Sequence, residues 1–202
     1  MRDYSRFDKF LDSLRGEIYA EPPSEPAISV TAMMVNHLKQ NGVLKAGMDV
    51  LDIGCGQGVA LAHFRDAEAK AIGITIGADY EVCKAAGYEV VEADQSFLEF
   101  PDQSFDLLWC RHVLEHSPFP LFTLSEYFRL TRVGGHVYVE VPAPDTSAYH
   151  HENLNHYSVF GLSSWQSLMR RTGFTIADAT AINVNVACGP DLYWGILLRR
   201  DQ

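Results

Sequence analysis

The stretch Val50-Leu51-Asp52-Ile53-Gly54-Cys55-Gly56-Gln57-Gly58 joins a short apolar run to a turn rich in glycine. The apolar run is bounded by turn-forming residues, which predicts a buried strand over 50–53. Glycines let the backbone turn sharply and approach a ligand closely, and the helix predicted over 58–64 presents free N–H groups at its start. The stretch therefore predicts a strand, a turn and a helix, and favours a nucleotide-like ligand at the turn over a purely structural turn.

Short apolar runs alternate with helical patterns on the C-terminal side of this stretch. Strands are predicted over 50–53, 71–74, 90–93, 105–110 and 136–141, and helices over 58–64, 79–86, 122–130 (ended by Gly134-Gly135) and 163–172. Such alternation predicts a parallel sheet with helices on both faces. Two further strands, 174–182 and 192–198, are separated by a short connection, so we expect them to pair antiparallel. The predicted fold is α/β: one doubly wound, Rossmann-like, seven-stranded and mostly parallel sheet with an antiparallel last strand.

The first part of the chain has a different pattern. Helices are predicted over 4–16, with Gly16 as the stop, and over 28–38, ended near Asn41-Gly42; three prolines between 21 and 26 separate them. We expect residues 1–42 to form an N-terminal helical cap segment and residues 43–202 to form one globular domain.

Composition restricts the partner and the compartment. The 202 residues include 16 Lys plus Arg and 26 Asp plus Glu, for a net charge of −10, which disfavours nucleic acid and favours a small-molecule partner. No run approaches the roughly 20 apolar residues of a membrane span, and no secretion signal is evident. Four scattered cysteines form no C-x-x-C pair, so reduced thiols in a cytoplasmic protein are expected.

The glycine-rich turn departs from two common nucleotide-binding patterns. Val59 stands where a dinucleotide-binding turn needs its third glycine, and no lysine follows Gly58 as a P-loop requires. Asp52 would repel a pyrophosphate but suits a cationic or hydrogen-bond-donating group. The turn therefore disfavours NAD and ATP.

Four segments together resemble the class I S-adenosylmethionine-dependent methyltransferases, in the small-molecule branch. Residues 50–58 resemble the family's first motif, 91–101 its third-strand adenine motif, 105–116 its fourth-strand motif and 132–135 the turn before its fifth strand. The resemblance covers roughly residues 43–174 and also implies an inserted antiparallel seventh strand. It implies S-adenosyl-L-methionine as cofactor and S-adenosyl-L-homocysteine as product.

The resemblance also implies cofactor contacts. They are Asp52, Gly54, Cys55, Gly56, Gln57, Gly58, Thr75, Ile76, Asp94, Gln95, Ser96, Cys110 and Arg111. The glycines would pass beside the methionine moiety, whose amino group Asp52 would contact. Asp94 would accept from the adenine amine. Cys110 and Arg111 would lie under the amino-acid part. Thr75 stands where the family usually has an acid for the ribose hydroxyls, and it cannot accept a bidentate pair as a carboxylate does.

Five of the eight histidines follow the fourth and fifth predicted strands. They are His112, His116, His150, His151 and His156. The carboxyl ends of neighbouring parallel strands share one edge, where ligands bind, and histidine is a suitable base near neutral pH. His116, His156 and His112 are the predicted catalytic residues. Residues 150–157 offer possible metal ligands, but their spacing matches no established pattern, so we expect a substrate-lining loop and no metal.

These observations predict a methyltransferase acting on a small molecule, with oxygen favoured as acceptor over nitrogen. The acceptor class would be a glycan, a lipid precursor or another metabolite. A noncatalytic cofactor-binding regulatory or scaffold domain is the alternative. Carbon methylation of the cyclopropane-synthase type is a lesser one, because Thr75 and Leu114-Glu115-His116 are similar to that branch.

Overall fold

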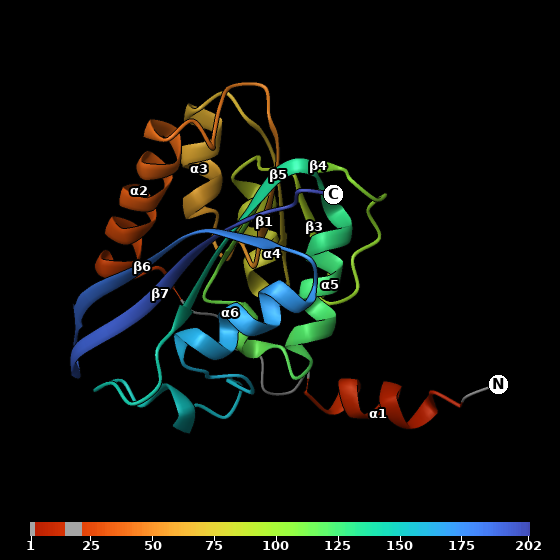
Figure 1. Ribbon diagram of the computed structural model, residues 1–202, viewed down its shortest axis with the longest axis vertical. Helices are drawn as coiled ribbons and strands as arrows, with labels where there is room; N and C mark the ends of the chain where they lie inside the picture. The colour runs from red at the N-terminus through yellow and green to blue at the C-terminus, as the bar shows by residue number, and fades with distance from the viewer. Residues whose placement is uncertain (1–2, 15–21) are drawn as a thin grey trace.

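A computed structural model describes residues 3–14 and 22–202, which form a seven-stranded sheet covered on both faces by helices (Figure 1). From one edge to the other the strands run β3 (Val90–Glu92), β2 (Lys70–Thr75), β1 (Asp49–Ile53), β4 (Phe105–Arg111), β5 (Thr131–Pro142), β7 (Gly189–Arg199) and β6 (Thr175–Val186). The first five are parallel, whereas β7 lies antiparallel to both β5 and β6. The predicted α/β class and the antiparallel last strand are confirmed.

The alternation of side chains along the central strands divides the core into two layers. Val50, Leu107 and Trp109 point to the face covered by α2 (Glu25–Gln40), α3 (Val59–Asp66) and α4 (Ala78–Ala85). Leu51 and Leu108 point to the face covered by α5 (Pro120–Leu130) and α6 (Leu162–Arg171). Successive side chains of a strand point to opposite faces of the sheet. Because both the odd and the even positions of these strands are apolar, both faces of the sheet are buried under helices.

Two strand predictions miss the true ends. The hairpin of β6 and β7 continues to the pair Val186–Gly189, because ladder pairing extends past the predicted ends to a two-residue turn. The strand predicted over 136–141 begins at residue 131, directly after the helix, which ends at residue 130 as predicted and is not ended by Gly134-Gly135. Thr131 at the start of β5 pairs with Phe105 before the register shifts to Leu107–His136. Gly134 and Gly135 lie in this shifted segment, where their backbones bond to Arg200.

The N-terminal helices occupy different positions. α1 (Ser5–Leu14) projects from the body beside the start of α5 (Figure 1), and the ring of its Phe7 lies 5.1 Å from that of Phe119. α2 begins earlier than predicted because Ser24 caps it and Pro26 fits its first turn. α2 packs against the sheet with α3. The predicted stop at Gly16 lies outside the described residues, and the division at residues 42 and 43 stays a prediction.

Candidate cofactor and acceptor site

The glycine-rich turn between β1 and α3 has one glycine at which a Cβ would not clash with a neighbouring side chain. Gly54, Gly56 and Gly58 all have positive φ angles, which favour glycine. A Cβ on Gly54 would collide with Val113, and one on Gly58 would lie 2.8 Å from Tyr88. A Cβ on Gly56 would meet nothing closer than Oδ2 of Asp79, at 4.0 Å. Packing therefore accounts for the absence of a side chain at Gly54 and Gly58, whereas a side chain at Gly56 would meet only ordinary contact with Asp79 and would fill space beside the turn.

Asp52 carries a buried carboxylate with an unused acceptor. Its side chain is 2% exposed, and Oδ2 has no hydrogen-bond partner among the described residues. Burial raises the pKa of Asp52 to about 8. A buried unpaired carboxylate is costly, and a cationic ligand group would offset that cost. The residue fits the ammonium group of S-adenosylmethionine.

A second carboxylate faces the same turn from α4. Asp79 is buried and accepts a hydrogen bond at Oδ1 from Nε2 of Gln57, 3.2 Å away. Thr75, where the ribose-binding acid was sought, is a buried residue at the end of β2, and Ile76 beside it is 38% exposed. Asp79 is not among the residues predicted from the sequence, because it lies in the first turn of α4 and not at the end of β2, where the family usually has its acid. The sequence signal that could have identified Asp79 is an acidic residue in the first turn of the helix that follows β2.

The segment after β3 is held by side-chain hydrogen bonds. Gln95 donates from Nε2 to the carbonyl of Val113 at 2.7 Å and accepts at Oε1 from the hydroxyl of Tyr127 at 2.6 Å. Ser96 is buried against Thr123, with its N–H donating to Asp94 Oδ1 at 2.7 Å. The side chains of Gln95 and Ser96 therefore join this segment to α5 and to the loop after β4. The exposed Asp94 retains a carboxylate at the surface.

The two buried cysteines among the predicted contacts are inert thiols. Burial raises the pKa of Cys110 to about 12, and its Sγ lies 3.4 Å from the Tyr127 hydroxyl. Burial, aided by the charge of Asp52, also raises the pKa of Cys55 far above its usual value. A thiolate is the nucleophilic form, so neither residue supplies one. Both can contribute only packing or weak hydrogen bonds to a ligand.

Arg111 and His112 share one buried carboxylate, Glu140. Nε of Arg111 lies 2.6 Å and Nε2 of His112 lies 3.1 Å from its Oε1, while Nη1 of Arg111 donates to Thr31 in α2. Burial lowers the pKa of His112, but Glu115 and Glu140 outweigh it and raise the pKa to about 9. His112 is therefore an imidazolium at neutral pH, a state that cannot accept a proton. The guanidinium of Arg111 is bound to the protein itself.

The remaining predicted histidines meet where the loops after β4 and β5 converge. The ring centroids of His116 and His156 are 4.7 Å apart, and those of His150 and His156 are 5.7 Å apart. His150 also contacts Asp191 Oδ2 through Nε2 at 2.9 Å. Burial lowers the pKa of His156, so its ring is neutral and able to accept a proton at neutral pH. His151 is exposed on the same loop, against Tyr149.

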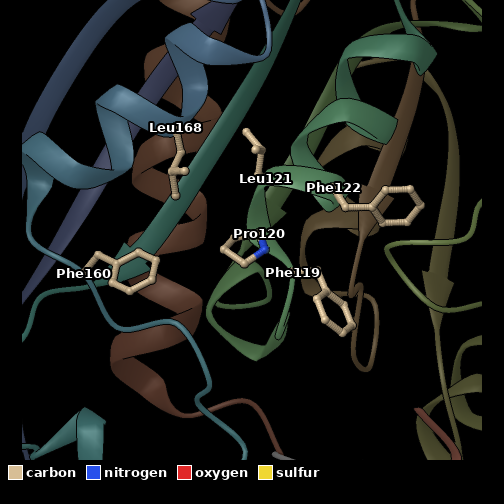
Figure 2. Close-up of a pocket in the computed structure, with 6 residues that line it drawn as sticks. All are labelled: Phe119, Pro120, Leu121, Phe122, Phe160 and Leu168. Atoms are coloured by element: carbon tan, nitrogen blue, oxygen red, sulfur yellow. The ribbon is translucent and has the colours of Figure 1, made fainter. Parts of the chain in front are cut away.

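An apolar pocket of about 410 Å³ lies between the start of α5 and α6 (Figure 2). Its lining residues are Phe119, Pro120, Leu121, Phe122, Phe160 and Leu168. Phe119 follows His116 closely in the chain, and Phe160 follows His156. The two segments that carry the paired histidines therefore continue directly into an apolar surface.

Sheet order, glycine-rich turn and buried β1 acid together define a class I S-adenosylmethionine-dependent methyltransferase domain. The family described as "Methyltransferase domain" matches residues 31–179, and the chain belongs to it.

Relatives of this domain differ in the atom that their names say they methylate. The ubiquinone biosynthesis O-methyltransferase of Pseudomonas aeruginosa is 31% identical over 138 residues, or 64% of this chain and 59% of that protein. The sterol 24-C-methyltransferase of Aspergillus fumigatus is 27% identical over 176 residues, or 82% and 43%. The chain thus spans about three-fifths or less of these two relatives.

A solved structure agrees in fold. The phosphoethanolamine N-methyltransferase 2 of Haemonchus contortus, in complex with S-adenosylhomocysteine, superposes with a TM-score of 0.71 at 16% identity and covers 85% of this chain and 53% of that one. In the described part of this chain, no helix is both long and apolar enough to cross a bilayer.

Proposed function

We propose that the protein transfers a methyl group from S-adenosylmethionine to an oxygen of a small molecule that has a substantial apolar part. The observation that carries the proposal is the contact of the glycine-rich turn with the histidine-bearing loop. Gly54 packs so closely on Val113 that a Cβ would collide with it. His116 follows in the same loop and lies against His156. A cofactor at the turn and an acceptor at the histidines would therefore be neighbours.

The residues of this chain would hold the cofactor through opposite charges and open backbone. Asp52 would pair with its ammonium group, Gly56 would leave room for its chain, and Asp79 would accept hydrogen bonds from ribose hydroxyls. Asp94 is the candidate acceptor for the adenine amine. When bound, S-adenosylmethionine supplies an electrophilic methyl group, so most of the catalytic work is positioning.

The acceptor oxygen would be activated at the paired histidines. A hydroxyl is a weak nucleophile until it loses its proton, and a neutral imidazole within hydrogen-bond reach assists that loss. His156 and His116 are the candidate groups, whereas the positively charged His112 would orient Glu115 and Glu140. The apolar lining of the pocket in Figure 2 suits a lipid-precursor acceptor better than a glycan.

Two alternatives rest on weaker support. Carbon methylation is favoured by the likeness to the sterol enzyme, by Thr75 and by Leu114-Glu115-His116. A noncatalytic cofactor-binding role would leave the convergence of His116 and His156 beside the turn without a use.

We also infer a reducing compartment, the cytoplasm, because all four cysteines are free thiols, three of them buried.

A methyl-transfer assay tests the proposal. The protein is incubated with labelled S-adenosylmethionine and a panel of apolar phenols, catechols, sterols and amines, and the formation of S-adenosylhomocysteine is measured. Mass spectrometry of the product identifies the methylated atom. We expect turnover with a hydroxylated apolar acceptor and less with amines or sterols. Tight cofactor binding without turnover of any acceptor would favour the noncatalytic alternative, and a ring- or chain-methylated carbon product would favour the other.

A further inference from the structure

Glu115 is a buried carboxylate that is only partly satisfied by its charged neighbour His112. It is 1% exposed, and neither Oε1 nor Oε2 has a hydrogen-bond partner among the described residues. The closest charged group is His112, whose Nδ1 lies 3.5 Å from Oε1, an ion-pair distance without hydrogen-bond geometry. The ion pair with His112 covers one side of the carboxylate and leaves Oε2 without a partner among the described residues. A buried polar atom left unsatisfied is costly and calls for an explanation such as an ion.

Two imidazoles beside Glu115 are held with one nitrogen facing away from the backbone. Nδ1 of His116 lies 3.1 Å from the carbonyl oxygen of Asn155, and Nδ1 of His156 lies 3.1 Å from that of His150. A carbonyl only accepts hydrogen bonds, so Nδ1 is the protonated nitrogen in both contacts. In the neutral ring Nε2 then carries a lone pair. A backbone carbonyl that receives the other ring N–H is the usual support of a metal-binding histidine.

The three side chains come together at one point. One ligand atom each from Glu115, His116 and His156 lies within 4.8 Å of the others. From this cluster we infer a binding site for a divalent transition-metal cation of the zinc class, ligated by two imidazoles and one carboxylate. Imidazole nitrogen suits zinc and its neighbours, whereas magnesium and calcium prefer all-oxygen sites. The inferred site departs from the expectation, drawn from the sequence, that no residue holds a metal.

Three protein ligands leave at least one coordination position open for water or for an acceptor oxygen. The second possibility rests on the proposed function. A hydroxyl bound in that position would ionise at lower pH and release its proton to solvent. His116 and His156 would then act as ligands that position the acceptor oxygen, rather than as bases that remove its proton. The site itself does not depend on methyl transfer.

Cobalt binding tests the site directly. Protein freed of metal by dialysis against a chelator is titrated with CoCl₂ while the visible d–d absorption is recorded, and ZnCl₂ is then used to displace the cobalt. We expect one cobalt per chain, with an absorption band typical of nitrogen and oxygen ligands, and displacement by zinc. Glu115→Gln and His156→Ala should each weaken cobalt binding by about 100-fold or more, because each removes one of three protein ligands.

Controls separate loss of the site from loss of the fold. His151→Ala removes an exposed imidazole of the same loop and should bind cobalt as the unmodified protein does. Calorimetry with S-adenosylhomocysteine on each variant reports an intact cofactor site. Absence of cobalt binding up to millimolar concentration, or binding by both ligand variants at unchanged affinity, would overturn the inference. Cobalt binding without methyl transfer to any acceptor would leave the metal site standing and count against the proposed function alone.

Discussion

His116 and His156 lie with their ring centroids 4.7 Å apart, although one follows β4 and the other follows β5. Each ring is held through Nδ1 by a backbone carbonyl, which leaves Nε2 for chemistry. The pairing joins two loops at the carboxyl edge of the sheet, where doubly wound folds bind their ligands.

Replacing either paired histidine should impair catalysis more than folding. In His116→Ala and His156→Ala, turnover should fall about 10²–10⁴-fold, whether the imidazole removes the proton or holds a cation that lowers the pKa of the acceptor hydroxyl. Both residues are only partly buried, so the melting temperature and the affinity for S-adenosylhomocysteine should change little. His63→Ala, in α3 and far from this edge, is the matched control. Unchanged turnover on a true acceptor would show that the pair is structural.

Gly56→Val should abolish binding of S-adenosylhomocysteine. The substitution fills the open space beside the turn and forces a branched residue into a φ of +50°, so stability should fall as well. Gly47→Val separates the two effects. Gly47 has a φ of +78° and no atom near its Cβ position, so that variant should lose stability but keep affinity. Calorimetry on both folded variants measures their affinities for S-adenosylhomocysteine. Equal affinities would refute the assignment of the glycine-rich turn as the cofactor site.

Asp79→Asn should lower the affinity for S-adenosylhomocysteine by about 10- to 100-fold. That range corresponds to one charge-assisted hydrogen bond, roughly 1.5–3 kcal/mol. Asparagine retains an acceptor for Gln57, so the local structure should persist. Glu81→Gln removes an exposed acid from the same turn of α4 and should leave the affinity unchanged. If the two variants bind alike, Asp79 does not contact the ribose.

Cofactor affinity should rise with pH through Asp52. Its pKa of about 8 lies above the usual 3.8 for aspartate, so at pH 6 the free protein holds the neutral acid. Pairing with an ammonium group needs the carboxylate, so binding must release a proton below pH 8. The affinity for S-adenosylhomocysteine should therefore increase by up to about tenfold per pH unit between pH 6 and 8.

Asp52→Asn is the control for this pH dependence. The amide cannot ionise, so its affinity should be lower than that of the unmodified protein at pH 8 and nearly flat across the range. Calorimetry in buffers of different ionisation enthalpy measures the released proton. A pH-independent affinity in the unmodified protein would show that Asp52 does not meet the ammonium group.

The sequence by itself determined the architecture. The apolar runs around residues 50–53 and 105–110 are buried on both sides, and only a parallel sheet between two helical layers does that. The short connection before β7 favoured an antiparallel pair, and an acid at position 52 disfavoured a pyrophosphate. These are local properties of pattern, chain length and charge, so they can be read without knowing which distant residues meet.

Only the tertiary structure decided which side chains share an environment. It showed that Gly56 alone of the three glycines could carry a Cβ without a clash, that Asp79 faces the turn, and that two buried carboxylates keep His112 charged. It also placed the buried carboxylate of Glu115 beside His116 and His156. Burial, tautomer and ion pairing depend on the distances between residues that come from different loops. The order of residues along the chain does not by itself give these distances.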